Sequence, residues 1–448
     1  MEKKEKIPSQ TLKRELGLGA ATAIVVGNMM GSGIFTSPQT LAQVANPYTN
    51  MWAWVITGTG SVMLALSFAN LGTLYPETGG PIVYVDKAYG KFMAFLVAWT
   101  FWIGSWIGNA AIITAIIRYV TVFFPGIATN NLVSFLISSG ILWLFTFINC
   151  LGVKQAGYIG IISTILKLAV IVVFVIVAII GFEPTYLKTY SSESVRGLSS
   201  LPAAIAVTLW SFIGLESASI SGGEIKNPEV NIKKSTFLGT AFVAVIYLVI
   251  SILAMGSLPQ GELAASSAPL ATIINQITGA TWGGGFIALG IIISATGALS
   301  GWVLTTARLS FAAGEDGIFP NFFAKVHPRY QTPYTSLIIT GICTNLILIL
   351  NYVSTLTAAF DFMVNLATLS FIPAYALTTG AEIILTLKHK PAHIGGFIWK
   401  NIRQLLAFAY TIYIIYGSGA ESAMWVFILM FVGIPFYIYQ QVSTEHMA

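Results

Sequence analysis

Two ionisable side chains stand in stretches of the sequence that are apolar and long enough to cross a membrane. Lys167 lies in the middle of one such stretch, and Glu216 follows Gly214 in another. A charged side chain at the centre of a bilayer costs about 3 kcal/mol or more, so such residues are usually functional or paired. We therefore expect Lys167 and Glu216 to take part in proton coupling. Two structural alternatives remain open: Lys167 could bind backbone carbonyls of a broken helix, and Glu216 could cap a helix.

Glycine and serine interrupt another apolar stretch in a way that suits anion binding. Residues 27–35 read GNMMGSGIF and lie at the centre of this stretch. Glycine is a poor helix former, so a helix that crosses a membrane here should break. The N–H groups that begin its second half could then bind a carboxylate. Close helix packing at Gly31 and Gly33 is the simpler alternative, but a second interruption at Gly214 favours a binding site.

Small and polar residues follow one face of the third apolar stretch. Gly104, Ser105, Gly108 and Asn109 recur at helical spacing and form a narrow polar stripe. Such a stripe could line a cavity, or it could serve helix packing with Asn109 as a hydrogen-bonding group. Trp302 also follows small residues; it could be an ordinary core or lipid-facing aromatic, or it could stack on a cationic substrate.

The composition identifies a protein with many membrane spans. Of its 448 residues, 56% are hydrophobic and 9% are charged, whereas soluble domains carry about 25% charged residues. The first residues are polar and basic, so no cleavable signal peptide is expected. The net charge of +5 is spread over many loops and does not indicate nucleic acid binding. We expect an all-α membrane protein with twelve transmembrane helices, near residues 17–43, 51–75, 90–121, 130–150, 157–182, 200–222, 236–258, 280–312, 334–350, 355–384, 402–417 and 422–441.

The basic residues of the loops predict the orientation of these helices. Most of the 22 Lys and Arg residues fall in loops on the same side as the N-terminus. Because cytoplasmic loops carry an excess of Lys and Arg, both termini should be cytoplasmic. The expected division is an N-terminal tail (1–16), a first five-helix repeat (17–182), an external loop (183–199), a second five-helix repeat (200–384), helices 11 and 12 (385–441) and a C-terminal tail (442–448).

The two interruptions occupy corresponding positions in two sets of helices. Gly31 and Gly214 each open a set of five expected spans. Because five is odd, the second set must be inverted relative to the first. Interrupted helices in corresponding positions of inverted halves are typical of secondary transporters with a binding site near mid-membrane.

Several other classes of function lack their motifs. The sequence contains no Walker A loop, no His-Glu-x-x-His and no Gly-x-Ser-x-Gly motif, so ATP-driven pumping and hydrolytic enzymes are not supported. Cys150 and Cys343 stand far apart and form no metal-binding or disulfide pattern. We therefore expect a protein that is not an enzyme and that holds no cofactor or metal.

The sequence resembles the amino acid–polyamine–organocation superfamily, and within it the basic amino acid/polyamine antiporters. The resemblance covers about Leu16 to Tyr439 and implies a LeuT-type fold in which helices 1 and 6 are broken. It further implies a cell inner membrane location and exchange of an arginine-like amino acid for its decarboxylation product or for another amino acid. Expected partners are a cationic amino acid, a polyamine or agmatine, protons and the lipid bilayer. Helices 11 and 12 lie outside the repeats and could pack against a second subunit in a homodimer. The segments that carry the resemblance are 27–35, 106–109 (WIGN), 209–219 (LWSFIGLESAS), 226–228 (KNP) and 301–302 (GW).

The same resemblance implies which residues bind the substrate. Ser32 and Gly33 match positions that hold the carboxylate, and the backbone of Ile213 matches the point that receives the α-amino group. Asn109 and Trp302 match residues that contact the substrate side chain, Trp302 by stacking. Glu216 matches an acid implicated in proton sensing, and the remaining implied positions are Trp210 and Phe101 as gates and Met29, Gly104, Ser105 and Thr368 in the pocket.

Two departures from the family pattern bear on the mechanism. Phe101 stands where arginine-transporting members have a gating tyrosine, so one gate hydroxyl is missing. Lys167 matches a lysine of proton-coupled or exchange-only members, which takes the place of sodium in sodium-driven relatives. This lysine argues against sodium and favours, as the alternative to exchange, a proton-coupled amino acid symporter. A nutrient sensor that binds without transporting would use the same pocket.

Overall fold

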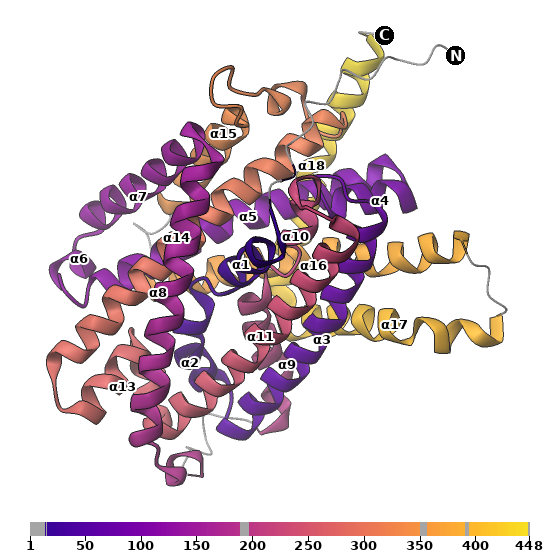
Figure 1. The fold of residues 1–448 in the computed structure, drawn as a ribbon. Coiled ribbons are helices and arrows are strands. Elements are labelled where there is room, and N and C mark those ends of the chain that lie inside the picture. Colours follow the sequence, from indigo (N-terminus) through magenta and orange to yellow (C-terminus); the bar gives the residue numbers. More distant parts are fainter. Residues whose placement is uncertain (1–13, 15, 189–196, 350–355, 390–393, 447–448) are drawn as a thin grey trace.

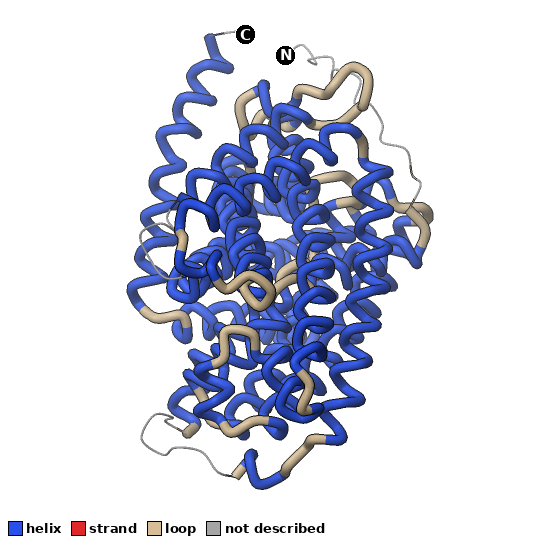
Figure 2. Tube along the Cα trace, turned by 90° about the vertical axis from the view of Figure 1, so that its left-hand side faces the viewer, coloured by secondary structure: helices blue, strands red, loops and turns tan. Residues whose placement is uncertain are grey.

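A computed structural model describes residues 14, 16–188, 197–349, 356–389 and 394–446, and every regular element in these ranges is a helix (Figures 1 and 2). The α-helices are α1 (Leu18–Met29), α2 (Gly33–Val44), α3 (Pro47–Leu74), α4 (Pro81–Tyr89), α5 (Lys91–Val120), α6 (Gly126–Thr129), α7 (Asn131–Leu151), α8 (Val153–Ile180), α9 (Leu201–Leu209), α10 (Ser217–Ile220), α11 (Pro228–Ser257), α12 (Gln260–Ala265), α13 (Pro269–Thr278), α14 (Thr281–Glu315), α15 (Tyr334–Ile349), α16 (Leu356–His389), α17 (Ile394–Gly417) and α18 (Ala420–His446). Short 3-10 helices are η1 (Pro184–Leu187), η2 (Leu198–Ser200), η3 (Trp210–Phe212), η4 (Gly222–Glu224) and η5 (Asn321–Ala324).

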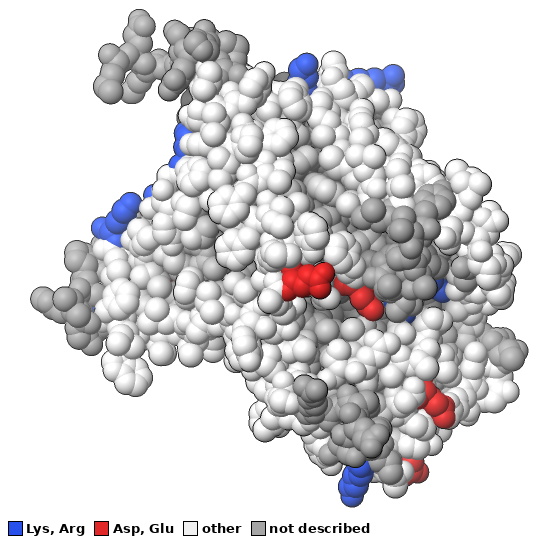
Figure 3. Space-filling model, turned by 180° about the vertical axis from the view of Figure 1, so that it is seen from behind, with Lys and Arg blue, Asp and Glu red and all other residues white. Residues whose placement is uncertain are grey.

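Length and composition make this a membrane-spanning bundle. Within the described residues, nine helical stretches are long and apolar enough to cross a membrane, and two further apolar helices are shorter. Large apolar side chains lie on the outside, among them Trp52 (58% exposed), Ile165 (62%) and Phe431 (64%). In Figure 3, uncharged side chains cover most of the visible face, and Lys and Arg appear mainly near its edges. Such a surface suits lipid rather than water.

The first predicted interruption is present in the structure. Helix α1 ends at Met29, the Met30 N–H still bonds to the Val26 carbonyl at 2.9 Å, and α2 begins at Gly33. The Gly31 N–H bonds to the Met29 carbonyl at 2.9 Å, instead of continuing the helical ladder to the carbonyl four residues back. The Gly27 and Asn28 carbonyls at the end of α1 therefore lack their helical donors, whereas the Met29 carbonyl accepts from Gly31.

The second predicted interruption lies directly against the first. After η3 the backbone is extended at Ile213 and turns through Gly214, whose φ of +116° suits glycine alone. A Cβ on Gly214 would lie 2.9 Å from the Met29 backbone nitrogen. The two breaks therefore meet through their backbones, and this contact requires glycine at position 214.

Helix α5 passes through the middle of the bundle and is joined to α2 near its C-terminal end. Arg118 is 3% exposed; it donates hydrogen bonds to the Gln39 side chain and, at 3.1 Å, to the Ser267 carbonyl. The next residue, Tyr119, donates a hydrogen bond to the Phe35 carbonyl at 2.8 Å. Arg118 is thus buried between helices near the C-terminal end of α5.

The opposite end of the bundle is held by backbone pairing and an ion pair. The Leu16 N–H bonds to the Glu224 carbonyl at 3.0 Å, and the Lys226 N–H bonds to the Leu16 carbonyl at 2.8 Å. The Glu224 carboxylate also accepts a hydrogen bond from Arg308 of α14 at 2.9 Å. The segment before α1 is thus tied to the segment before α11.

Several expected boundaries differ from the observed ones. Helix α11 begins at Pro228 rather than near 236, because Pro at the first turn favours a helix start. Helix α16 continues to His389, past the expected end of the second repeat at 384. Helix α18 continues to His446, so most of the expected tail 442–448 is helical. Within the expected N-terminal tail and external loop, residues 1–13, 15 and 189–196 lie outside the described residues.

Candidate functional site

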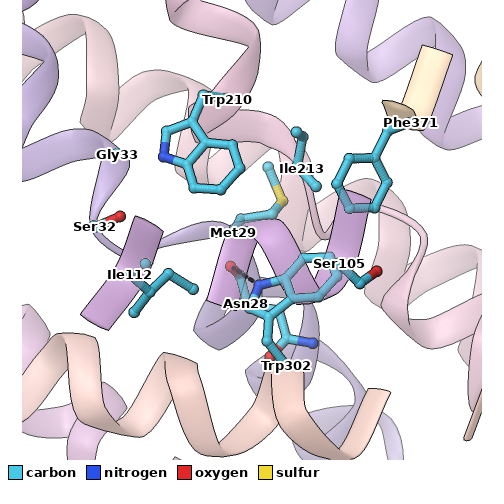
Figure 4. Close-up of a pocket in the computed structure, with 12 residues that line it drawn as sticks. Asn28, Met29, Ser32, Gly33, Ser105, Ile112, Trp210, Ile213, Trp302 and Phe371 are labelled. Carbon is cyan, nitrogen blue, oxygen red and sulfur yellow. Dashed lines mark hydrogen bonds between the residues drawn. The ribbon is translucent and has the colours of Figure 1, made fainter. Parts of the chain in front are cut away.

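A pocket lies where the two helix breaks meet α5, α14 and α16 (Figure 4). Both breaks contribute backbone and side chains, α5 contributes small residues, and α14 and α16 each contribute an aromatic ring. Because glycines cluster in this wall, main-chain groups can reach the pocket. The lining residues are Asn28, Met29, Gly31, Ser32, Gly33, Ser105, Gly108, Ile112, Trp210, Ile213, Trp302 and Phe371.

One end of the pocket is formed by the N-terminus of α2. The first N–H groups of a helix have no partner within that helix and carry its positive dipole end. The hydroxyl of Ser32 is buried here and has no hydrogen-bond partner among the described residues. A Cβ on Gly33 would lie 2.6 Å from the Ser211 hydroxyl oxygen and 3.0 Å from Trp210 Cδ1, so only glycine fits between the two breaks. This end can bind a carboxylate through N–H and O–H donors.

The last three carbonyls of α1 each accept a hydrogen bond from a side chain of a different helix. Lys167 Nζ of α8 donates to the Gly27 carbonyl at 3.1 Å. Trp302 Nε1 of α14 donates to the Asn28 carbonyl at 3.0 Å, and the Tyr247 hydroxyl of α11 donates to the Met29 carbonyl at 2.7 Å. A cation beside the negative end of the α1 dipole is favourable. These donors stabilise the interruption that the glycine sequence creates.

Lys167 therefore binds a backbone carbonyl of a broken helix, as the structural alternative proposed. Its side chain is fully buried, and its described hydrogen bond goes to the backbone of the broken helix. This position is compatible with a coupling role as well, because any change at the ammonium group would act directly on the break.

Glu216 lies behind the pocket and joins the second break to α16. Its Oε2 atom accepts a hydrogen bond from the Gly214 N–H at 3.2 Å and from the Tyr375 hydroxyl at 3.0 Å. Its Oε1 atom is buried and has no hydrogen-bond partner within the part of the chain that the structure describes. The residue stands at the N-cap position of α10, but its side chain makes no capping hydrogen bond there. The Glu216 side chain therefore does not cap a helix, which was the structural alternative considered from the sequence.

Several aromatic rings surround the pocket. The Trp302 ring lies 5.8 Å from the ring of Phe371, in an edge-to-face arrangement. Phe371 in turn lies 4.6 Å from Phe101, also edge to face. Asn28 supports this wall, because its side-chain amide donates hydrogen bonds to Ser217 at 2.9 Å and Thr305 at 3.3 Å.

The structure brings together most of the residues expected to bind substrate. Those that line the pocket are Met29, Ser32, Gly33, Ser105, Trp210, Ile213 and Trp302. Gly104 does not line it; a Cβ there would lie 2.9 Å from the Ser370 Cβ, so Gly104 permits close packing of α5 on α16 instead. Thr368 also lies off the wall and donates its hydroxyl to the Val364 carbonyl at 2.6 Å.

Two further expected residues lie next to the pocket without lining it. Phe101 packs behind Phe371. Asn109 is 1% exposed, and in the described ranges neither its amide oxygen nor its amide nitrogen has a hydrogen-bond partner. A buried unpaired polar group costs about 1–3 kcal/mol, so Asn109 is a candidate to bind a polar group of a ligand.

Sequence reasoning missed some of the lining residues. Phe371 carries no signal, since it is an apolar residue in an apolar helix. Asn28 stood within a recognised segment but was not singled out as a pocket residue, and only the folded arrangement shows its position. Gly108, part of the stripe that could line a cavity, does line the pocket. Within the described residues, no cluster of three or more His, Cys, Asp or Glu side chains could hold a metal ion.

Comparison with known proteins identifies the family of the chain. The family model for amino acid permeases matches residues 16–444. An arginine/agmatine antiporter of Chlamydia abortus is 30% identical over 440 residues, which cover 95% of this chain and 90% of the relative. The arginine/agmatine antiporter of Chlamydia pneumoniae is also 30% identical with the same coverage, and that of Chlamydia felis is 29% identical over 441 residues, again 95% and 90% of the two chains. The chain belongs to the amino acid permease family, within the amino acid–polyamine–organocation superfamily.

Proposed function

We propose that this protein is a secondary transporter that exchanges an arginine-like amino acid for its decarboxylation product or for another amino acid. The proposal includes twelve membrane helices in a LeuT-type five-plus-five inverted repeat that works by alternating access. It also includes a cell inner membrane location with both termini in the cytoplasm. The two broken helices that meet at the pocket support the repeat, and the loop charges support the orientation.

The observation that carries the proposal is the set of unpaired donors at the start of α2. Ser32 and Gly33 at the start of α2 line the pocket beside the second break, and the Ser32 hydroxyl has no partner among the described residues. The first N–H groups of a helix have no partner within it, so this end suits the α-carboxylate. The backbone at Ile213 is extended, so its carbonyl is free of the helical ladder and suits the α-amino group. An α-amino acid thereby bridges the two breaks, and its side chain extends toward Trp302.

The choice of a cationic side chain rests on Trp302 and on the relatives. The indole N–H of Trp302 is held by the Asn28 carbonyl at 3.0 Å, which fixes the orientation of the ring at the pocket wall. A cation over a tryptophan face is stabilised by about 0.5–2 kcal/mol. Relatives of nearly the same length are named arginine/agmatine antiporters, so arginine with agmatine is the first exchange pair to test.

A proton-coupled symporter is the second candidate, and Lys167 favours it. Its ammonium group is bound to the Gly27 carbonyl at the break itself, and the Glu216 carboxylate is bound to the other break. Protonation at either residue would alter a hydrogen bond that shapes the pocket. Titration at Lys167 or Glu216 is therefore a direct route from protons to the substrate site.

Exchange in proteoliposomes separates these functions. Vesicles are loaded with unlabelled arginine, labelled arginine is added outside, and uptake is measured with and without a pH gradient. Lysine, ornithine, agmatine, putrescine and neutral amino acids are then tested as internal counter-substrates. Uptake that requires a cationic substrate inside supports exchange. Uptake into empty vesicles driven by a proton gradient supports symport, and binding without any uptake supports a sensor.

A further inference from the structure

Phe371 lies at the end of the pocket opposite the start of α2. Figure 4 shows Ser32 and Gly33 on one side and Phe371 on the other, with Met29 and Trp302 between them. An amino acid whose carboxylate binds at Ser32 therefore points its side chain toward the Phe371 ring. This ring lies where a long side chain would have to end.

The Phe371 ring is held firmly in this place. It is 1% exposed, and Phe101 packs against it from behind with ring centroids 4.6 Å apart at 80°. Gly104 brings α5 close to the ring, because a Cβ on Gly104 would lie 3.2 Å from Phe371 Cε2. The ring cannot swing toward α5 without a clash, so it forms a rigid wall rather than a mobile one.

The chemistry of this end selects for a particular kind of side chain. None of the described residues that line the pocket is an Asp, Glu, Lys or Arg. The Ser105 hydroxyl donates to the Phe101 carbonyl at 2.8 Å, which leaves its oxygen free to accept a hydrogen bond. Trp302 and Phe371 lie edge to face at 5.8 Å. One acceptor and two rings can receive a cationic group without any carboxylate.

We propose that Phe371 is a specificity-determining residue that limits the length of the substrate side chain and, with Trp302, stabilises its positive charge. This inference rests on the proposed function, since it assumes that an α-amino acid binds between the two breaks. It assigns to Phe371 two separable properties: a volume that closes the pocket and a ring that interacts with a cation.

Two substitutions separate the two properties. Phe371→Leu removes the ring but keeps most of the apolar volume, whereas Phe371→Ala opens the end of the pocket. Labelled arginine exchange is measured in proteoliposomes against unlabelled arginine, citrulline and homoarginine. Citrulline has the length of arginine without its charge, and homoarginine is one methylene longer.

The expected results follow from these differences. In the wild-type protein, homoarginine should compete much less well than arginine. Phe371→Leu should weaken competition by arginine about fivefold more than competition by citrulline. Phe371→Ala should let homoarginine compete at least as well as arginine. The control Phe95→Leu replaces an equally buried phenylalanine of α5 that packs on Trp99 and Phe319 away from the pocket, and it should leave the ranking of competitors unchanged.

Other results would overturn the inference. Equal competition by homoarginine and arginine in the wild-type protein would show that the pocket is not closed at this end. An unchanged ranking in Phe371→Leu would remove the residue from charge recognition, and this variant decides the matter if the alanine variant does not fold. Absence of any amino acid exchange by the folded wild-type protein would instead contradict the proposed function itself.

Discussion

Lys167 caps the carbonyl of Gly27, with the ammonium nitrogen 3.1 Å from the carbonyl oxygen. In an unbroken helix this carbonyl would accept from the N–H of Gly31, which bonds to Met29 instead. The lysine therefore replaces a helical hydrogen bond that the break removes. Its position ties one side chain on α8 to the helix break that borders the candidate site.

Replacing Lys167 should impair transport without unfolding the protein. Lys167→Ala leaves the Gly27 carbonyl buried and unpaired, which costs about 1–3 kcal/mol and loosens the end of α1. We expect exchange in proteoliposomes to fall about tenfold or more, while the size-exclusion profile in detergent stays that of wild type. Lys188→Ala, at an exposed lysine, is the control. Normal transport with a normal pH profile would show that Lys167 has no coupling role.

Glu216→Gln should flatten the pH dependence of exchange. Glutamine keeps a side-chain oxygen that can accept from the Gly214 N–H and the Tyr375 hydroxyl, so the local structure should persist. The variant cannot bind or release a proton at this position. Initial exchange rates measured between pH 5 and 8 test the expectation, with Glu262→Gln at an exposed site as the control. A profile identical to wild type would exclude Glu216 as the proton-sensing group.

Trp302→Leu should weaken the binding of cationic substrates more than the binding of neutral ones. The loss of a ring that faces a cation corresponds to about 1–2 kcal/mol, or roughly five- to thirtyfold in affinity. Trp302→Phe keeps a ring but removes the N–H that caps the Asn28 carbonyl, so it measures the capping contribution separately. Competition assays with arginine and citrulline distinguish the loss of stacking from the loss of the capping hydrogen bond. Equal losses for both competitors in Trp302→Leu would rule out recognition by stacking.

Gly33→Ala should abolish substrate binding, because the new methyl group has no room. Its Cβ would lie 2.6 Å from the Ser211 hydroxyl oxygen and 3.1 Å from the Ser211 Cα, which forces the two helix breaks apart. Gly19→Ala in α1 is the matched control, since a Cβ there meets nothing within 4 Å. Binding is measured by the rise in melting temperature on adding arginine. If arginine raised the melting temperature of Gly33→Ala as much as that of the wild-type protein, substrate binding would not need contact between the two breaks.

Arg403→Leu should lower the stability of the protein rather than its selectivity. Arg403 of α17 forms an ion pair with the buried carboxylate of Glu382 on α16 and donates to the Met63 carbonyl at 3.0 Å. Removing one partner of a buried ion pair costs about 3–5 kcal/mol; because Arg403 is partly exposed, the lower end is expected. The melting temperature in detergent should fall clearly, whereas Lys400→Leu, at an exposed position of the same helix, should change it little.

The helix breaks were predictable because their cause is local. Glycine disfavours helix wherever it stands, so Gly31 and Gly214 revealed the interruptions without any tertiary information. The same reasoning could place Lys167 in the membrane but not choose between a proton site and a backbone cap. That choice depends on α8 packing beside α1, which no pattern within the stretch around Lys167 specifies.

The wall of the pocket was less predictable because small and apolar residues serve several purposes. Gly104 was expected in the pocket, yet it allows close contact with α16. Phe371 was not expected there, since nothing distinguishes it from the apolar residues around it in α16. The position of Phe371 depends on the missing side chain of Gly104, a relationship between two distant parts of the chain.

The lengths of α1 and α2 determine how the membrane voltage acts on a bound substrate. Each helix has 12 residues and is thus about 18 Å long, so the break lies near the middle of a hydrocarbon layer of about 30 Å. A charge bound there has crossed about half of the electrical potential, which amounts to roughly 1 kcal/mol per charge at 100 mV. Under the proposed exchange, a singly charged substrate moving in and a doubly charged product moving out would transfer net charge. The cycle would then generate a voltage, because each turnover would carry one net positive charge outward.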